Sequence, residues 1–434
     1  MTVATIVALA SGRPPAAIAV IRISGPAAFA GVAALTVMAL PVARQMALRR
    51  LVDRVSGVVL DSAMVVLFPG PASATGEDLA ELHLHGGIAV VSGVLAALTA
   101  MPDVRLAEAG EFTRRGFANG RIDLAQVEGL ADLVAAETAA QRDQALALAG
   151  GTLSRVADAW RERCIMILAE AEAALDFGED EEDVAAQLNK AAQVELLALV
   201  DELDAALADA KRGARTRDGL TIAISGAPNV GKSSLVNALV ERDVAIVTSI
   251  AGTTRDAIEV PIDFDGVAAV LIDTAGLRET DDLIEAEGIR RARMRVADAD
   301  LVIEVIDVPR ADVESAGFLV VNKIDTMDIL PAAGEQVFAV SATRGDGLAV
   351  LRAALSAWAA AVVRPGEPAL LSHARHAAAF GDAAEALRGA AAVEDAVLRT
   401  EGLRMAARAF GRIAGRVDVD DVLDRIFSRF CIGK

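Results

Sequence analysis

The stretch Gly226-Ala227-Pro228-Asn229-Val230-Gly231-Lys232-Ser233 decides how the central part of this chain folds. It matches the phosphate-binding pattern G-x-x-x-x-G-K-[ST] without a mismatch. The apolar run 220–225 before it predicts a buried strand, and residues 234–240 after it predict a helix. The two glycines let the backbone curl so that N–H groups point at phosphate oxygens, beside a helix N-terminus with partial positive charge. We therefore expect a nucleoside triphosphate site, with Lys232 at the β- and γ-phosphates and Ser233 on Mg²⁺.

Three further motifs follow in the order of a guanine-nucleotide site. A strand ends in Asp273-Thr274-Ala275-Gly276, in which the aspartate is expected to hold the water shell of Mg²⁺ and the glycine N–H to sense the γ-phosphate. The next is Asn322-Lys323-Ile324-Asp325, whose final carboxylate can accept both N1–H and the exocyclic amine of guanine. The backbone of Ser341-Ala342-Thr343 is expected to contact guanine O6. Each motif alone is weak, but the ordered set predicts GTP rather than ATP, in a doubly wound α/β domain.

The segment between the first two motifs completes the expected nucleotide site. A threonine in this segment, Thr254, can bind Mg²⁺ from the switch side, together with Ser233. The expected GTP contacts are Asn229, Val230, Gly231, Lys232, Ser233, Ser234, Thr248, Ser249, Ile250, Ala251, Gly252, Thr253, Thr254, Asp273, Thr274, Ala275, Gly276, Asn322, Lys323, Asp325, Ser341, Ala342 and Thr343.

The catalytic side of this motif set is unusual. Leu277 stands where Ras-like enzymes place a glutamine that orients the attacking water. A leucine cannot polarise water, and the sequence points to no arginine finger. Intrinsic hydrolysis is then expected to be slow, ~10⁻⁴ to 10⁻³ per second if Ras-like, unless another group contributes.

Composition bounds the remaining choices. Of the 434 residues, 54% are hydrophobic but only 3% aromatic, so the cores must consist of Ala, Val, Leu and Ile. The formal net charge of −19 argues against a general nucleic-acid coat protein, although it does not exclude a local basic groove. Two cysteines provide no disulfide framework, and the first residues lack the basic region of a signal peptide, so we expect a cytoplasmic protein. The uncharged stretch 23–43 is interrupted by prolines and is too short to span a membrane.

The chain around the nucleotide-binding region predicts further domains. Residues 1–118 predict a small α+β domain, with strands at 5–10, 17–24, 58–60, 63–68 and 79–85 and helices at 27–40 and 88–101. Helical periodicity covers 123–149, 154–175 and 184–212, and it returns over 365–429. We therefore expect a multidomain α+β and α/β protein, in which a discontinuous helical domain (119–215 and 365–434) is interrupted by an inserted nucleotide-binding domain (216–361).

Four stretches outside the inserted domain carry a specific resemblance. They are Ile21-Arg22-Ile23-Ser24-Gly25, then 75–78 with 81–87, then 109–126, and the C-terminal Cys431-Ile432-Gly433-Lys434. With these, and with Gly252-Thr253-Thr254-Arg255-Asp256 after the phosphate loop, nearly the whole chain resembles the MnmE/TrmE family of potassium-dependent, TrmE-Era-like tRNA-modification GTPases.

The resemblance implies how hydrolysis is accelerated. In this family the loop asparagine, which corresponds to Asn229, and switch-segment groups, here at Thr248, Ile250 and Thr253, hold K⁺ where an arginine finger would place its charge. A glutamate after the D-x-x-G motif orients the attacking water, and the spacing places it at Glu285. From the residues alone, Glu285 is an ordinary surface-helix glutamate and Glu287 is equally eligible. The resemblance also implies that the nucleotide-binding domains dimerise with GTP and K⁺ bound.

For the ends of the chain, the resemblance implies a folate site. It implies a homodimer formed through the N-terminal domain, which holds a 5-formyl or 5,10-methylene tetrahydrofolate derivative at Arg22, Glu81, Arg121 and Lys434. Two positions depart from the family: Arg121 replaces its usual lysine, and Ala74 replaces its tyrosine. Cys431 is either a nucleophile for uridine C6 or a residue that positions the chain end.

The resemblance further implies a function. With a flavin-containing partner of the MnmG/GidA type, in a heterotetramer or larger assembly, the chain would add an aminomethyl-type (carboxymethylaminomethyl) group to C5 of the wobble uridine of certain tRNAs. It would itself bind no flavin and no membrane. Two alternatives remain: an Era-like ribosome-assembly GTPase without modification chemistry, and a helical scaffold with a vestigial GTPase.

Overall fold

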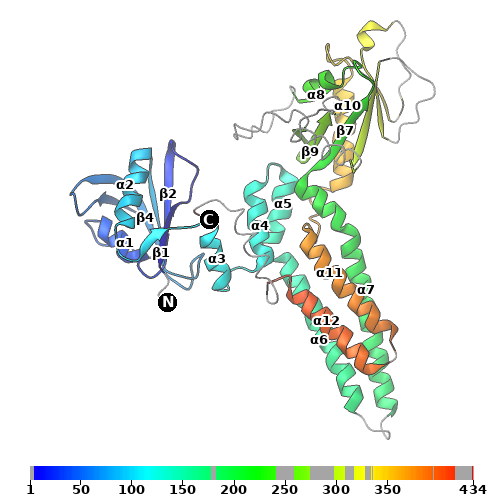
Figure 1. The fold of residues 1–434 in the computed structure, drawn as a ribbon, viewed down its shortest axis with the longest axis horizontal. Coiled ribbons are helices and arrows are strands. Elements are labelled where there is room, and N and C mark those ends of the chain that lie inside the picture. Colours follow the sequence, from blue (N-terminus) through cyan, green and yellow to red (C-terminus); the bar gives the residue numbers. More distant parts are fainter. Residues whose placement is uncertain are drawn as a thin grey trace, which may run out of the picture. The chain divides into compact units, whose positions relative to one another are not determined.

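The computed structural model (Figure 1) describes residues 4–176, 182–240, 259–273, 298–307, 317–327, 334, 336–393, 395–415 and 433, and the side chains among these outside 174–189. The chain divides into two compact units. The first contains residues 1–131, 154–158 and 410–434, and the second contains 132–153 and 159–409.

The first unit is built on a six-stranded sheet in the order β3-β4-β5-β2-β1-β6. Neighbouring strands are antiparallel except β1 and β6, which run parallel. The elements are β1 (Thr5–Leu9), β2 (Ala16–Ser24), α1 (Ala28–Leu35), β3 (Ala47–Val52), β4 (Val59–Phe68), β5 (Leu79–Gly86), α2 (Ile88–Thr99), β6 (Val104–Leu106), α3 (Glu111–Ala118) and α4 (Leu124–Ala135), of which α4 ends in the second unit.

The two faces of this sheet differ. Alternate residues of β2, namely Ala19, Ile21 and Ile23, are buried in the main core of the unit, to which α1 and α2 contribute (Figure 1). The opposite face carries Arg22. Among the described residues, only part of this face is covered, by a small cluster in which Phe112 of α3 packs against Ile6 and Ala8. Alternation along the strands therefore leaves one open, partly polar face.

The second unit contains a sheet in the order β12-β11-β10-β7-β9-β8, in which only the β8–β9 hairpin is antiparallel. Its core is mostly aliphatic, as the low aromatic content requires. Its elements are β7 (Leu220–Gly226), α8 (Lys232–Val240), β8 (Glu259–Phe264), β9 (Val267–Asp273), β10 (Leu301–Ile306), β11 (Phe318–Val321), η3 (Ile324–Thr326), β12 (Val337–Ala339) and α10 (Leu348–Val363).

Helices form the rest of the second unit, although residues 154–158 of α6 and the last two residues of α12 belong to the first. They are α5 (Ala139–Ala149), α6 (Thr152–Asp176), α7 (Glu182–Asp218), α11 (Ala374–Ala392) and α12 (Ala396–Gly411). Thr138 and Gln141 form a capping box that begins α5. Trp160 of α6 packs on Phe380 of α11, with ring centroids 5.1 Å apart. None of the described helices is long and apolar enough to cross a membrane.

Several element predictions were wrong in detail. The helix predicted at 27–40 ends at Leu35, because Thr36 is extended and pairs with Leu51. The strands predicted at 58–60 and 63–68 form one strand, β4. Two strands were missed: β3, which alternates poorly and carries two arginines, and β6, which has only three residues. The predicted helix 123–149 is two helices, and α7 extends beyond the predicted 184–212 at both ends.

Candidate nucleotide-binding site

The phosphate loop connects the end of β7 to the start of α8. Gly226 and Gly231 have φ values of 142° and 95°, and Asn229 is also left-handed at 65°. A Cβ on Gly226 would lie 2.2 Å from the carbonyl oxygen of Val305, and one on Gly231 would lie 2.3 Å from Nδ2 of Asn322. Both glycines are therefore required by close backbone approach as well as by φ.

Lys232 is held inside this loop. Its side chain is buried, and Nζ donates to the carbonyl oxygens of Gly226 and Ala227, each at 2.9 Å. The ammonium charge thus lies at the centre of the curled backbone. This is where a loop of inward-pointing N–H groups can hold phosphate oxygens.

Two oxygen groups meet beside the loop. Ser233 at the start of α8 donates its hydroxyl to Asp273 Oδ2 at 2.5 Å, and Asp273 ends β9. A hydroxyl and a carboxylate are hard oxygen ligands of the kind that Mg²⁺ prefers. The residues present therefore fit a magnesium ion, which Ser233 and Asp273 would hold and which would neutralise phosphate charge when bound.

Asn322 joins the phosphate loop to the base side of the site. It is only 2% exposed. Its Nδ2 donates to the carbonyl oxygen of Val230 at 2.9 Å, and its Oδ1 accepts from the backbone N–H of Ala342 at 3.0 Å. One buried amide therefore sets the spacing between the loops after β7, β11 and β12. Sequence reasoning placed Asn322 at the nucleotide but missed this bracing role.

The residues predicted to select guanine lie on the neighbouring loops. Ser341 donates its hydroxyl to Asp325 Oδ1 at 2.5 Å, which orients the carboxylate in η3. Lys323 Nζ donates to the carbonyl oxygen of Asn229 at 2.7 Å and pairs with Asp307 at 3.0 Å. Asp307 was not a sequence-based candidate, and no motif marks it. The loops after β7, β11 and β12 and the last residue of β9 thus meet at the carboxyl edge of the sheet.

Part of the predicted set lies outside the described residues. This applies to the switch positions 248–254 (Thr248, Ser249, Ile250, Ala251, Gly252, Thr253 and Thr254), to Thr274, Ala275 and Gly276, to Glu285, and to Cys431 and Lys434.

A second candidate site lies on the open face of the N-terminal sheet. Arg22 of β2 and Glu81 of β5 are register partners, and the guanidinium donates to Glu81 Oε1 at 2.8 and 3.1 Å. His83, two residues further along β5, approaches Glu81 Oε2 at 3.3 Å. The Arg22 guanidinium also lies 5.9 Å from the centroid of the Phe112 ring. The result is a half-buried ion pair beside an aromatic ring.

The other two predicted folate residues have different settings. Arg121 follows α3, and its Nε donates to the carbonyl oxygen of Ser73 at 3.1 Å. Lys434 is not described, but its neighbour Gly433 lies so close to β1 that a Cβ there would be 2.1 Å from the Leu9 carbonyl oxygen. Arg22 pairs with Ala8 of the same strand. Gly433 therefore lies close to β1, the strand next to the one that carries Arg22.

A buried charge network supports this face. Glu111, at the start of α3, accepts from Arg105 at 2.6 and 2.8 Å and from Arg115 at 2.9 Å, and Arg115 also reaches Glu77 at 3.0 Å. Burial raises the pKa of the Glu111 carboxyl, but the hydrogen bonds from Arg105, the Glu108 backbone and Arg115 outweigh burial and lower the pKa to about 2. The network holds α3 and the loop containing Glu77 to the sheet.

Comparison with known protein families matches both halves of this architecture. Residues 5–121 match the N-terminus of the GTP-binding protein TrmE, and residues 124–431 match the MnmE helical domain.

Full-length relatives agree with these matches. The tRNA modification GTPase MnmE of Azorhizobium caulinodans is 50% identical over 438 residues, covering 99% of both chains. That of Rhodospirillum rubrum is 50% identical over 462 residues, covering 100% of both. That of Methylorubrum populi is 50% identical over 437 residues, covering 99% of this chain and 98% of that protein. A GTP-hydrolysing enzyme of tRNA modification accounts for the matched domains and the phosphate loop together, and the chain belongs to the tRNA modification GTPase MnmE family.

Proposed function

We propose that this enzyme adds an aminomethyl-type (carboxymethylaminomethyl) group to C5 of the wobble uridine of certain tRNAs. It does so with a flavin-containing partner of the MnmG/GidA type and a tetrahydrofolate one-carbon donor. The observation that carries the donor part is the open sheet face with its Arg22–Glu81 pair. We propose the cytoplasm as its compartment, because tRNA is modified there and used there in translation.

The chemistry of this pair suits a folate. A guanidinium binds the carboxylates of a glutamyl tail, and a carboxylate accepts from the N–H edge of a pterin. The Phe112 ring beside Arg22 offers an apolar surface to a planar heterocycle. Arg121 and the terminal Lys434 would add positive charge for the tail. Cys431 stays a candidate for either nucleophilic attack on the uridine or positioning of the terminus.

Binding of 5-formyltetrahydrofolate to the full-length chain tests the donor site. Isothermal titration should show binding that falls at least tenfold in Glu81→Gln and in Arg22→Met, while GTP hydrolysis stays unchanged. The matched control is Arg142→Met, which removes an exposed arginine of α5 and should bind 5-formyltetrahydrofolate like the unchanged chain. Absence of binding by the unchanged chain would favour the alternative, an Era-like ribosome-assembly switch.

For hydrolysis, we propose that K⁺ takes the place of an arginine finger. Asn229 would provide a ligand from the phosphate loop, with groups of Thr248, Ile250 and Thr253 from the switch segment, while Ser233 and Thr254 hold Mg²⁺. Glu285 would orient the attacking water. Hydrolysis should be faster in KCl than in NaCl, and Glu285→Ala should lower it roughly tenfold or more. Glu287→Ala is the control. An equal loss of GTP hydrolysis in Glu287→Ala would contradict the assignment of Glu285 as the residue that orients the attacking water.

The cellular product is the broadest test of the proposal. Nucleoside analysis of tRNA from cells that lack this gene should show loss of the modified wobble uridine. Reintroducing the unchanged gene should bring the modified nucleoside back, whereas reintroducing a gene that encodes Glu285→Ala should not. Unchanged wobble uridines together with accumulated ribosome precursors would instead support the assembly-switch alternative.

A further inference from the structure

One carboxylate outside the nucleotide motifs contacts the link between two loops of the site. Asp307 follows β10 and pairs with Lys323 Nζ at 3.0 Å, and the same Nζ donates to the Asn229 carbonyl oxygen at 2.7 Å. In the sheet, β10 lies between β7 and β11, so the end of β10 lies between the phosphate loop and the loop that carries Lys323. Because the lysine reaches across the end of β10, a carboxylate at position 307 can hold its ammonium group there.

The two residues joined by this link have an uncommon backbone conformation. Asn229 and Lys323 are both left-handed, with φ values of 65° and 62°. Residues other than glycine seldom adopt this conformation, and it persists where the surrounding contacts enforce it. The hydrogen bond from the Lys323 side chain to the Asn229 carbonyl is such a contact, because it ties the phosphate loop to the loop after β11.

The link also fixes the direction of one peptide group in the phosphate loop. In a planar trans peptide, the C=O and the following N–H point in opposite directions. Because Lys323 holds the Asn229 carbonyl, the N–H of Val230 points away from Lys323. The Val230 side chain is apolar and only 4% exposed, so this N–H is the group through which Val230, a predicted GTP contact, can bind a phosphate oxygen.

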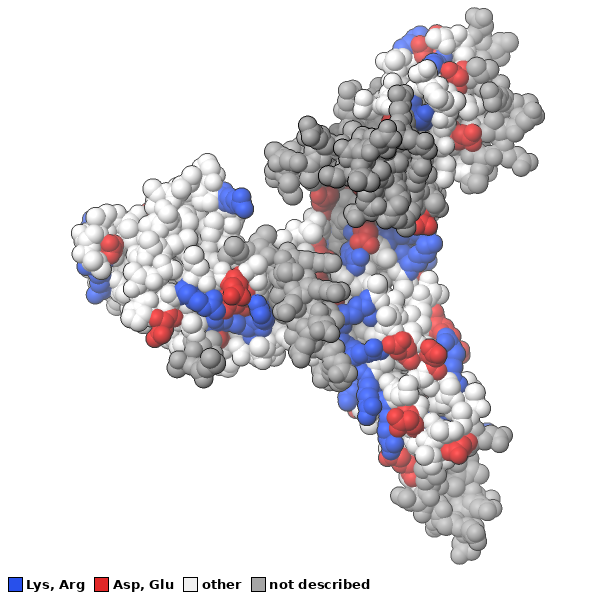
Figure 2. Space-filling model, viewed as in Figure 1, with Lys and Arg blue, Asp and Glu red and all other residues white. Residues whose placement is uncertain are grey.

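Ion pairs occur elsewhere on this protein and do not by themselves indicate a function. Figure 2 shows acidic and basic side chains close together over the long helices of the second unit, as in the Arg404–Glu172 pair. Exposed pairs of this kind contribute little to stability. The Asp307–Lys323 pair is similarly exposed, but its cation also bonds a carbonyl of the phosphate loop. Its effect is therefore expected on nucleotide binding rather than on folding.

We propose that Asp307 is a positioning residue for nucleotide binding. Its carboxylate holds the Lys323 ammonium on the Asn229 carbonyl, which keeps the Val230 N–H directed at the nucleotide phosphates. Without the carboxylate, the flexible lysine side chain has more conformations available and occupies the bonded one less often. Asp307 thus acts through Lys323. This role builds on the nucleotide-binding function of the phosphate loop and on no part of the proposed tRNA chemistry.

Titration of the nucleotide-free, full-length chain with the fluorescent nucleotide mant-GDP tests this role. Asp307→Asn and Asp307→Ser, which remove the carboxylate, should each weaken binding three- to tenfold. Asp307→Glu keeps the carboxylate and should bind within twofold of the unchanged chain. The matched control is Asp346→Asn, which breaks an exposed ion pair with Arg344 in the loop after β12 and should leave binding unchanged.

A double-mutant cycle tests whether Asp307 acts through the lysine. In a chain that already carries Lys323→Met, adding Asp307→Asn should change mant-GDP affinity less than twofold, because the group that the carboxylate holds is gone. Competition with unlabelled nucleotides separates the phosphate from the base. Asp307→Asn should weaken GDP and inosine diphosphate by the same factor, since inosine lacks only the exocyclic amine that Asp325 is predicted to bind. A changed ratio of the two affinities would place the effect at the base and overturn the proposed role.

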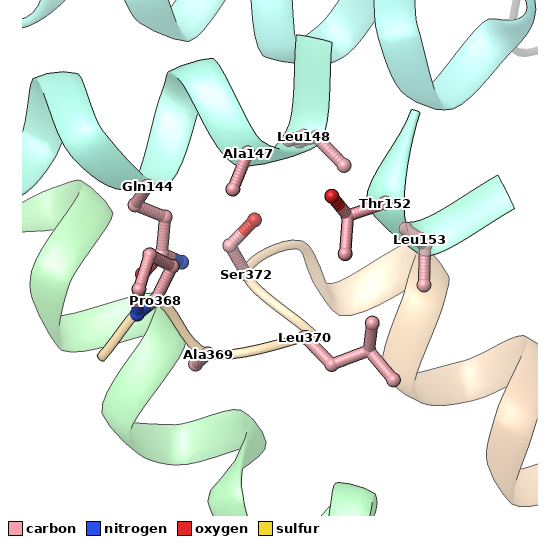
Figure 3. A pocket seen from close by; sticks show the side chains of 9 residues that line it. All are labelled: Gln144, Ala147, Leu148, Thr152, Leu153, Pro368, Ala369, Leu370 and Ser372. Atoms are coloured by element: carbon pink, nitrogen blue, oxygen red, sulfur yellow. The ribbon is translucent and has the colours of Figure 1, made fainter. Parts of the chain in front are cut away.

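Leu148→Ala tests whether reduced stability alone weakens nucleotide binding. Leu148 is buried and lines a mostly apolar cavity of about 300 Å³, bounded by α5, the start of α6 and the connector 368–372 between α10 and α11 (Figure 3). None of the described residues that line this cavity belongs to the nucleotide loops. Leu148→Ala should lower the melting temperature and leave mant-GDP binding unchanged, whereas Asp307→Asn should do the reverse.

Three results would overturn the role of Asp307. The first is that Asp307→Asn and Asp307→Ser bind mant-GDP as tightly as the unchanged chain. The second is that Asp307→Asn has its full effect in the chain that carries Lys323→Met. The third is that Leu148→Ala weakens mant-GDP binding as much as Asp307→Asn does.

Discussion

At the scale of single residues, the predicted selectivity for guanine would depend on how the Asp325 carboxylate is held. Asp325 accepts from the Ser341 hydroxyl at 2.5 Å, so one of its oxygens is held by the protein and the group cannot rotate freely. Ser341 itself is fully buried. The predicted selectivity would therefore also depend on a contact between the loops after β11 and β12, in addition to the N-K-x-D motif.

Asp325→Asn should weaken GTP binding at least tenfold and improve binding of xanthosine triphosphate. Guanine offers two donors, N1–H and the amine, whereas xanthine offers N1–H and a carbonyl oxygen that an amide can complement. Competition titrations with the two nucleotides measure the change. Ser341→Ala, which loosens the carboxylate but keeps it, should weaken GTP binding less and leave the preference for guanine. If the unchanged chain and Asp325→Asn had the same ratio of affinities for GTP and xanthosine triphosphate, Asp325 would not contact the base.

Glu111 should make the first unit sensitive to acid. Its pKa is lowered from 4.5 to about 2, so the stabilisation is present above pH 4.5 and is lost as the pH falls through 2. At about 1.4 kcal/mol per pKa unit, this amounts to about 3 kcal/mol. Urea unfolding should show Glu111→Gln less stable than the unchanged chain at pH 6, with the difference shrinking between pH 4.5 and 2. A difference independent of pH would refute the ionic contribution of this network.

At the scale of elements, close approach between segments overrides local propensity. Glycine in a helix costs about 1 kcal/mol relative to alanine, yet α7 carries Gly213 where the connector 368–372 passes. The same reasoning explains α1, which was predicted to continue to residue 40. Thr36 instead joins Leu51 in a β-bridge, so a long-range pairing ends the helix.

Gly213→Ala should destabilise the protein although alanine is the better helix former. The new Cβ would lie 1.9 Å from the Leu371 carbonyl oxygen and 3.0 Å from the Ala369 Cβ, and overpacking of this kind costs about 1–3 kcal/mol. Gly389→Ala in α11 is the matched control, because nothing lies within 4 Å of its Cβ position, and it should stabilise by about 0.5–1 kcal/mol. Melting temperatures of both variants measure the effect. If both variants raised the melting temperature, the close contact would not restrict this position.

At the scale of the whole molecule, the open face of the N-terminal sheet is the surface that we expect the predicted homodimer to bury. Leu48, Met64, His83 and Val20 are successive register partners across β3, β4, β5 and β2, so their side chains lie on one face. Leu48 is 60% exposed. Apolar side chains grouped on an exposed sheet face are typical of protein–protein contacts.

Leu48→Asp should therefore weaken self-association of the full chain at least tenfold, as measured by sedimentation velocity. If two copies associate through this face, an aspartate at position 48 would lose water without gaining a partner, which disfavours association. Val55→Asp is the control, because Val55 is 95% exposed in the turn between β3 and β4 and lies outside this face. This face would be excluded as the dimer contact if the unchanged chain were a monomer. It would also be excluded if the unchanged chain were a dimer and Leu48→Asp sedimented as the same dimer.

The sequence by itself determined the fold class, the family and the loops of the nucleotide site. These depend on local requirements: strand periodicity, glycines at fixed spacing and side-chain types that suit phosphate, Mg²⁺ and guanine. The phosphate loop and the end of β9 needed no tertiary information, because a strand, a glycine turn and a helix start are contiguous in the chain. The multidomain α+β and α/β prediction is confirmed by the two sheets and the helical elements.

Only the tertiary structure decided what depends on contacts between distant segments. Asn322 joins its own loop to the loops after β7 and β12, and Gly433 lies against β1 at the other end of the sequence. The edge strands β3 and β6 form because a neighbouring strand supplies their hydrogen bonds. Their own sequences show no clear strand pattern. Such features have no local signature, since their free energy arises from burial and pairing that exist only once the chain has folded.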